Sequence, residues 1–253
     1  MAPGRTTRQA MSRRDAGTLV VYGVHAVHEL LQGGEPVTRL YLGRGPREAE
    51  LARLASARGV PVERAERGVL DQLARSPSHQ GAVALAPPFR YQPLEHLLEP
   101  EPRSVLVLDG VQDPRNLGAI LRTARAAGVG GVILPRDRSV GITSVVATTS
   151  AGLLFGLPVA QVANLVRALE ALKSAGFWLV GLIPGGGQPL FTFTPPTRPA
   201  VVVGGEGEGI RPLVARHCDF AVSIPMAPRV ESLNVSVATG IALYEILVRP
   251  RLP

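Results

Sequence analysis

Three segments of the chain combine residue types that can take part in chemistry. The first, residues 108–118 (LDGVQDPRNLG), runs from an apolar stretch through a polar turn into a helix that Asp113 is suited to cap. Asn116 and Arg122 lie six positions apart, which places them on different faces of that helix. Taken alone, the segment is explained best by a capped helix with exposed arginines.

The second segment, residues 203–209 (VGGEGEG), is a glycine-rich turn directly after an apolar run. Such a turn lets the backbone approach a ligand closely, although a flexible surface turn is the simpler explanation. The pattern matches neither GxGxxG nor the phosphate-binding GxxxxGK[ST], and Glu206 and Glu208 would repel a pyrophosphate. It therefore disfavours NAD or ATP and favours a ligand with hydroxyl, amine or cationic groups.

The third segment, residues 224–236, leads into a final helix that is apolar almost all round and is therefore predicted to be buried. Ser232 is suited to cap this helix. Asn234 and Ser236, in its first turn, would then need hydrogen-bond partners. Helix capping explains Ser232 well and Asn234 poorly.

All three segments lie in a predicted α/β domain, residues 104–253. Its apolar strands alternate with helices, which predicts a mostly parallel sheet with helices on both faces. The glycine-rich turn is expected at the carboxyl edge of that sheet. Strands are expected at 104–109, 131–135, 157–162, 177–183, 199–210 (running into the turn) and 219–226, and helices at 114–128, 142–155, 164–176 and 232–248.

A smaller α/β domain is predicted for residues 19–90, between a basic flexible arm at 1–18 and a proline-rich linker at 91–103. Its apolar runs and helical patterns are bounded by glycines and prolines. Strands are expected at 19–22, 37–43, 61–65 and 81–86, and helices at 24–31, 46–59 and 66–75.

Composition narrows the class of protein. With 253 residues and 45% apolar side chains, the chain is neither collagen-like, nor a coiled coil, nor wholly disordered, and no stretch is long enough to span a bilayer. The net charge is +7 and Lys173 is the only lysine, so arginine dominates; this fits nucleic-acid binding and a coding bias equally well. The single Cys218 and the scattered histidines predict no disulfide, no metal and a cytoplasmic setting.

Together, the three segments resemble, in order and spacing, the three motifs of the SpoU (TrmH-like) RNA ribose methyltransferases of the SPOUT superfamily, over residues 104–248. YGVHAVHELL (22–31) and HQGAVALAP (79–87) are similar to the small α/β (L30e-like) substrate-binding domain of the subgroup that modifies a guanosine in large-subunit ribosomal RNA. The resemblance implies a deep trefoil knot, S-adenosylmethionine as methyl donor, and a homodimer with its site near the subunit interface.

The resemblance also implies roles for individual residues. Asn116 and Asn234 would orient the arginine and the ribose, Ser232 would position the loop, and Glu206 would fix the arginine or a hydroxyl. Two roles stay open for Arg122: the base proposed in this family, or, because a guanidinium is effectively never deprotonated, a group that grips phosphate or stabilises an alkoxide. The implied catalytic group is Asn116, Arg122, Glu206, Ser232 and Asn234, and the implied cofactor contacts are Gly204, Gly205, Glu206, Gly207, Ile224, Met226 and Leu233, with Thr148 and Ser150 from a further stretch.

The expected function is S-adenosylmethionine-dependent methylation of a ribose 2′-hydroxyl, on a guanosine of 23S ribosomal RNA. A transfer RNA methyltransferase is the alternative within this class. A non-catalytic RNA-binding or ribosome-assembly protein on the same fold is disfavoured because all five polar motif residues are present. A dinucleotide-dependent oxidoreductase is disfavoured because its glycine pattern is missing.

Overall fold

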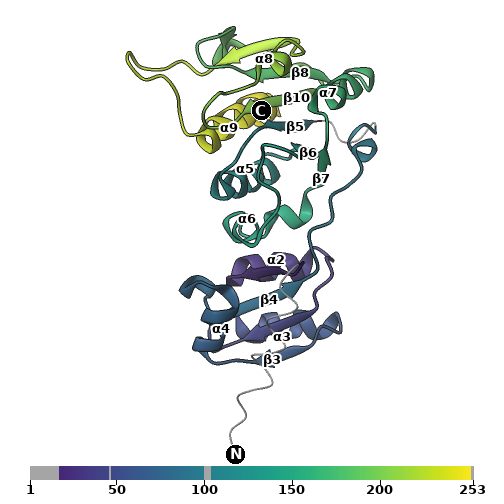
Figure 1. The fold of residues 1–253 in the computed structure, drawn as a ribbon, viewed down its shortest axis with the longest axis vertical. Helices are drawn as coiled ribbons and strands as arrows, with labels where there is room; N and C mark the ends of the chain where they lie inside the picture. The colour runs from purple at the N-terminus through teal and green to yellow at the C-terminus, as the bar shows by residue number, and fades with distance from the viewer. Residues whose placement is uncertain (1–16, 46, 100–103, 252–253) are drawn as a thin grey trace, which may run out of the picture. The chain divides into compact units, whose positions relative to one another are not determined.

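The computed structural model describes residues 17–45, 47–99 and 104–251 (Figure 1). The chain divides into two compact units, residues 1–90 and 91–253. The basic arm predicted at 1–18 lies outside the described residues, except for residues 17 and 18. In the described part of the chain, no helix is both long and apolar enough to cross a membrane.

Unit 1 is a four-stranded sheet in the order β1-β4-β2-β3, flanked by helices. Strand β4 runs antiparallel to β1 and β2, whereas β2 and β3 are parallel. All seven elements predicted for this unit are present. They are β1 (Leu19–Tyr22), α2 (Val24–Gln32), β2 (Arg39–Leu42), α3 (Glu48–Ala57), β3 (Val62–Arg64), α4 (Arg67–Ala74) and β4 (Ala82–Ala86), with a 3-10 turn, η1 (Pro77–His79), before β4.

Unit 2 is a seven-stranded sheet in the order β7-β6-β5-β10-β8-β11-β9, in which every described strand pair is parallel. The predicted parallel sheet is therefore confirmed. Its strands are β5 (Val105–Asp109), β6 (Gly131–Pro135), β7 (Val159–Val162), β8 (Trp178–Leu182), β9 (Gln188–Pro189), β10 (Pro199–Gly204) and β11 (Phe220–Ser223). Its helices are α5 (Pro114–Ala126), α6 (Ser144–Thr149), α7 (Leu165–Ser174), α8 (Pro212–Ala215) and α9 (Val235–Leu243).

The sheet of unit 2 is buried on both faces. Val105 and Val107 of β5 pack with Leu169 of α7 in one apolar cluster. Because side chains alternate along a strand, Leu106 and Leu108 point to the other face, where they are also fully buried. Burial on both faces explains why β5, β6 and β10 read as continuous apolar runs.

The strand order of unit 2 reverses between β5 and β10. From β5 the chain moves through β6 to β7 on one side, and then returns to place β10 against the other side of β5. Ligands of open parallel sheets bind outside the carboxyl ends of the strands at such a reversal. The first two chemical segments of the sequence leave the sheet at this point.

The predicted linker at 91–103 is wrong for residues 91–99, which are part of unit 2. The Gln92 N–H donates to the Val159 carbonyl (2.8 Å), and a 3-10 turn, η2 (Leu94–Leu97), follows. Leu97 is fully buried in the same apolar cluster as α7. The prolines of this stretch indicated a spacer, but leucines at 94, 97 and 98 form an apolar face. Residues 100–103 lie outside the described residues.

Three other predicted elements are shorter than expected. The final helix begins at Val235 and is capped by Asn234, not Ser232, and it passes after Leu243 into a π-helical turn (Tyr244–Val248). The strand expected at 219–226 is confined to β11. The helix expected at 142–155 divides into α6 and a 3-10 turn (Leu153–Gly156), because the backbone has positive φ at Ala151 and Gly152. The trefoil knot stays a prediction.

Candidate active site

The candidate site lies where β5 and β10 end side by side, with Asp109 paired to Gly204. A Cβ on Gly204 would lie 1.9 Å from the Gly209 carbonyl carbon, and one on Gly205 would lie 2.3 Å from the Gly110 oxygen. Gly205 and Gly209 also form an isolated antiparallel bridge. The glycine-rich loop therefore folds back on itself and packs against the turn after β5, and this close packing by itself already requires glycine at both positions.

A buried ion pair holds the far end of this loop. The Asp109 side chain is fully buried, and the Nε of Arg211 donates to its Oδ1 (2.7 Å) while the Arg211 backbone N–H donates to its Oδ2 (2.9 Å). A carboxylate buried in this way needs such partners. Sequence analysis missed both residues; the available signal was an acid at the end of a buried strand.

Residues from all three segments meet in one hydrogen-bond network. The Glu206 carboxylate accepts from Asn116 Nδ2 (2.9 Å) and from the backbone N–H groups of Gln112 (3.2 Å) and Asp113 (3.3 Å). Asn234 Nδ2 donates to Asn116 Oδ1 (3.1 Å). The structure thus places three of the five predicted catalytic residues together, and the side-chain partner of Glu206 is an asparagine, whereas the prediction gave an arginine or a hydroxyl.

The first turn of α9 supplies the partners that sequence analysis required. Asn234 Oδ1 accepts from the backbone N–H of Ser236 (2.9 Å) and from its hydroxyl (2.6 Å). With Nδ2 directed to Asn116, the Asn234 amide is fixed at both ends. Ser232 precedes the cap and is exposed.

Arg122 and Ser232 are outside this network. Arg122 is exposed on α5, about 9 Å along the axis from Asn116 and roughly 240° around it. Neither side chain has a hydrogen bond or ion pair among the residues that the structure describes. Their catalytic roles stay predictions.

The residues predicted to contact the cofactor differ in how exposed they are to solvent. The loop residues Glu206 and Gly207 are exposed, and a Cβ on Gly207 would meet nothing within 4 Å. Ile224 and Met226 are half-buried after β11, and Leu233 is 37% exposed. All of these remain predicted contacts.

Thr148 belongs to α6, which packs closely on α5, and Ser150 is the C-cap of α6. A Cβ on Gly118 would lie 2.6 Å from the Thr149 Cβ. Ser150 is fully buried, and its hydroxyl donates to the Ala147 carbonyl (2.9 Å). The contact of Thr148 and Ser150 with a cofactor stays a prediction.

The charge of Glu206 stabilises its network. Burial by itself raises the pKa of Glu206, but hydrogen bonds from Asn116 and from the amides of Gln112 and Asp113 outweigh it, so the pKa lies below its ordinary value of 4.5. A carboxylate with a lowered pKa contributes stability above its ordinary pKa, and this contribution is lost as the pH falls through the lowered value.

We therefore expect Glu206→Gln to destabilise unit 2 by about 1 kcal/mol or less at neutral pH, since Glu206 is exposed. The difference from the unmodified chain should shrink as the pH falls below the ordinary pKa. Urea unfolding followed by Trp178, the only tryptophan and a residue of β8, measures this. Glu208→Gln is the matched control, because Glu208 is exposed and has no hydrogen bond among the described residues. A pH-independent difference would contradict the prediction.

Comparison with known families decides which class of protein this is. The SpoU rRNA Methylase family matches residues 103–244, and the RNA 2′-O ribose methyltransferase substrate binding family matches residues 20–92. The chain belongs to the SpoU rRNA methylase family. The family predicted from the three motifs is thereby confirmed, together with its α/β fold and its RNA methyltransferase class.

Individual proteins that are similar to this SpoU family member support the same assignment. It is 44% identical, over 89% of its length and 94% of the relative's, to the 23S rRNA (guanosine-2′-O-)-methyltransferase RlmB of Pseudomonas putida. The S-adenosylmethionine-bound rRNA methyltransferase of Sinorhizobium meliloti superposes with a TM-score of 0.81 at 29% identity, covering 97% of this chain and 92% of the other. The SpoU methyltransferase AviRb of Streptomyces viridochromogenes, also bound to S-adenosylmethionine, gives 0.78 at 26%, covering 98% and 94%.

Proposed function

We propose that this SpoU family member transfers the methyl group of S-adenosylmethionine to the ribose 2′-hydroxyl of a guanosine in 23S ribosomal RNA, in the cytoplasm. One observation carries the proposal. The Asn116–Glu206–Asn234 network joins all three motifs at the strand-order reversal. The 44% identity to the Pseudomonas putida RlmB supports the choice of 23S RNA and guanosine.

The loop after β10 fits the proposed donor in chemical type. When bound, S-adenosylmethionine supplies a methyl group on a cationic sulfonium. The loop offers open space at Gly207 and two carboxylates, Glu206 and Glu208, which favour a cation and disfavour a polyphosphate. Gly204, Gly205 and Gly207, with Ile224, Met226 and Leu233, are the residues we propose to hold it.

The network acts by positioning. Because Glu206 already accepts three hydrogen bonds and its pKa is lowered, it is a poor base and serves to fix Asn116. Asn116 and Asn234 then orient the ribose, so that its hydroxyl meets the methyl group in line. The exposed Arg122 holds the adjacent phosphate and stabilises the alkoxide that develops as the hydroxyl proton passes to solvent water. Ser232 positions the segment before α9.

We further propose that the enzyme is a homodimer. The final helix was predicted to be buried, but Val237 of α9 is 50% exposed, and Tyr244 of the π-helical turn that follows α9 is 48% exposed. A second copy of the chain that covers this face would complete its burial.

Two measurements test the proposal. S-adenosylmethionine at a hundred times its dissociation constant should stabilise the folded chain by roughly 2.7 kcal/mol, and NAD should not stabilise it. Labelled methyl groups should pass to 23S ribosomal RNA, and mapping of ribose methylation with and without the protein should find one added 2′-O-methylguanosine. Methylation of transfer RNA but not of 23S RNA would identify a transfer RNA methyltransferase. Binding of S-adenosylmethionine without any methyl transfer to RNA would identify a non-catalytic RNA-binding protein.

A further inference from the structure

Unit 1 contains a pocket that the proposed reaction does not use. Its volume is about 1020 Å³, at the upper end of the range of roughly 300–1,000 Å³ that small-molecule sites occupy. It lies at the sheet edge where β2 ends and β4 begins, since Leu42 pairs with Ala82. Four segments contribute to its lining: residues 24–25; residues 42–45 and Arg47; residues 64–67 and Leu70; and Pro77 with residues 79–81. Pro46 lies outside the described residues.

Two loops that line the pocket are in backbone contact. A Cβ on Gly45 would lie 2.9 Å from the Gln80 carbonyl oxygen, and one on Gly81 would lie 3.1 Å from the Arg44 carbonyl oxygen. Gly81 also has a positive φ of 86°. The loop after β2 is therefore held against the turn before β4, and only glycine permits this approach.

The turn before β4 is fixed from within. His79 is 4% exposed, and its Nδ1 accepts from the Gly81 N–H (3.0 Å), so its Nε2 carries the hydrogen that Asp71 Oδ1 accepts (3.0 Å). The next side chain, Gln80, accepts from the Val24 N–H (3.3 Å) at the start of α2. The pocket is therefore preformed, which reduces the ordering cost of binding.

The charged side chains that line the pocket are mostly cationic. Arg64 is paired with Glu48. Arg44 and Arg67 are exposed and have no hydrogen bond or ion pair among the described residues. These two are therefore available for an anionic ligand. The charged residues of the lining are Arg44, Arg47, Arg64, Arg67 and Glu66.

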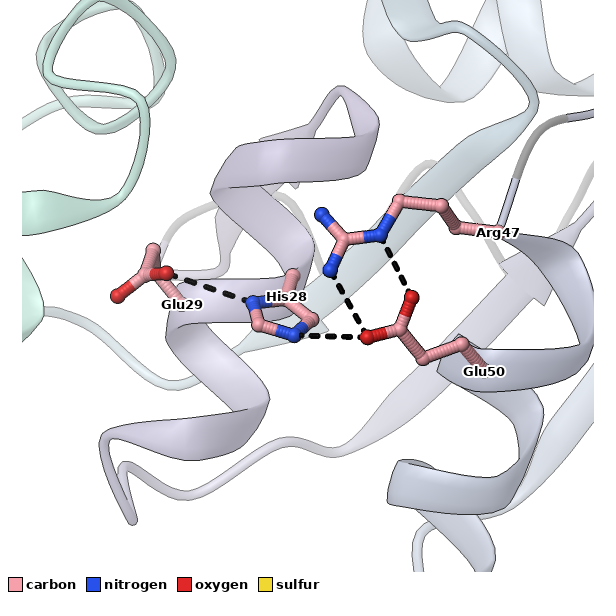
Figure 2. A network of polar contacts seen from close by, with 4 residues as sticks. All are labelled: His28, Glu29, Arg47 and Glu50. Carbon is pink, nitrogen blue, oxygen red and sulfur yellow. Dashed lines mark hydrogen bonds and ion pairs between the residues drawn. The ribbon is translucent and has the colours of Figure 1, made fainter.

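Arg47, one of the lining residues, is held by the carboxylate of Glu50 (Figure 2). Its Nε and Nη2 donate to the two carboxylate oxygens of Glu50 (2.6 and 2.8 Å), and Glu50 also contacts His28 Nε2 (3.1 Å). The hydrogen bond from Arg47 is the main cause that lowers the pKa of Glu50 to about 2, so the pair stays charged at neutral pH. A guanidinium whose plane is fixed in this way is suited to stack on a base.

The inner wall of the pocket is apolar. Leu42 and Leu70 are 1% exposed and Val24 is 4% exposed. Of the two imidazole rings in the described lining, His79 is buried and His25 is exposed. An apolar wall with unpaired arginines matches the apolar face and the anionic phosphate of a nucleotide. A continuous A-form helix instead presents its phosphates and 2′-hydroxyls on a convex surface, and its bases are stacked inside.

We propose that this pocket binds one unpaired nucleotide of the RNA substrate, with the base on the wall formed by Val24, Leu42 and Leu70 and the phosphates on Arg44 and Arg67. The proposal rests on the proposed function for the nature of the ligand. Beyond the proposed function, this proposal states that unit 1 recognises an RNA base that is not stacked within a helix.

The test uses the full chain and two probes, a mixed-sequence single-stranded RNA and the same RNA annealed to its complement. In the double variant Arg44→Gln/Arg67→Gln, the dissociation constant for the single strand should rise roughly tenfold or more. The slope of the logarithm of the binding constant against the logarithm of the salt concentration should become less steep by about 1.4, because two phosphate contacts are lost. His25→Ala, which removes the exposed ring of the lining, should weaken binding of the single strand and leave duplex binding unchanged.

Arg53→Gln/Arg90→Gln is the matched control, because it removes the same charge from exposed arginines of unit 1 outside the pocket. Equal losses of RNA affinity in the control and pocket variants would overturn the proposal that the pocket binds RNA. Equal losses of affinity for single-stranded and for paired RNA would overturn the proposal that the bound nucleotide is unpaired. Methyl transfer to 23S RNA, measured on the same preparations, separates the two proposals. If no methyl transfer occurs but the pocket variants still bind single-stranded RNA more weakly, only the proposed function is overturned. If methyl transfer occurs but the pocket variants bind RNA normally, only the pocket proposal is overturned.

Discussion

Replacing Arg122 with alanine should lower the turnover number for methyl transfer by roughly 100- to 1,000-fold, the cost typical of removing one transition-state-stabilising donor. S-adenosylmethionine affinity and folding stability should stay unchanged, because Arg122 is exposed and has no partner among the described residues. Arg122→Lys should recover only part of the rate, since lysine keeps the charge and loses the planar fork. Single-turnover methyl transfer with separately measured RNA affinity checks this.

The matched control for Arg122 is Arg167→Ala. Arg167 is an exposed arginine of α7, the helix packed against the opposite face of the sheet from Leu106 and Leu108 of β5, and it lies outside the proposed site. The Arg167→Ala variant should transfer methyl groups at the same rate as the unmodified chain. Turnover within threefold of the unmodified chain in both Arg122 variants would remove this arginine from the chemistry. A rate loss explained wholly by weaker RNA binding would assign it to phosphate binding alone.

The elements of unit 2 could be predicted because each is specified locally. An apolar run such as residues 105–109 fits only a strand buried on both faces, and Asp113 followed by Pro114 marks the start of a helix. The failures came from competing local signals. Ser232 and Asn234 can both cap a helix, and only the three-dimensional path shows that Asn234 reaches the first amides.

The contacts of the candidate site are less accessible to sequence analysis. Asn234 stood out because a polar side chain in an apolar helix requires partners, and the structure supplies Asn116 and Ser236. The identity of those partners depends on strand order, which brings together residues about a hundred positions apart. The pocket of unit 1 was missed for the same reason, since four separate segments form it.

The second large effect is expected for stability, in Arg211→Met. This change leaves the fully buried Asp109 with the Arg211 backbone N–H and without its cation, so unit 2 should lose about 3 kcal/mol of unfolding free energy. Urea unfolding followed by Trp178 reports on unit 2 specifically, because this tryptophan is the only one in the chain. S-adenosylmethionine affinity should fall as well, since Arg211 closes the loop that begins at Gly204.

A double variant separates the charge from the packing. Asp109→Leu/Arg211→Met replaces both partners by apolar groups and should recover much of the stability that Arg211→Met loses, because no uncompensated buried charge remains. Recovery of stability without recovery of donor affinity would show that the pair positions the loop. A single Arg211→Met variant as stable as the unmodified chain would mean that water reaches Asp109 in that variant, and that the loop is held by its glycine contacts alone.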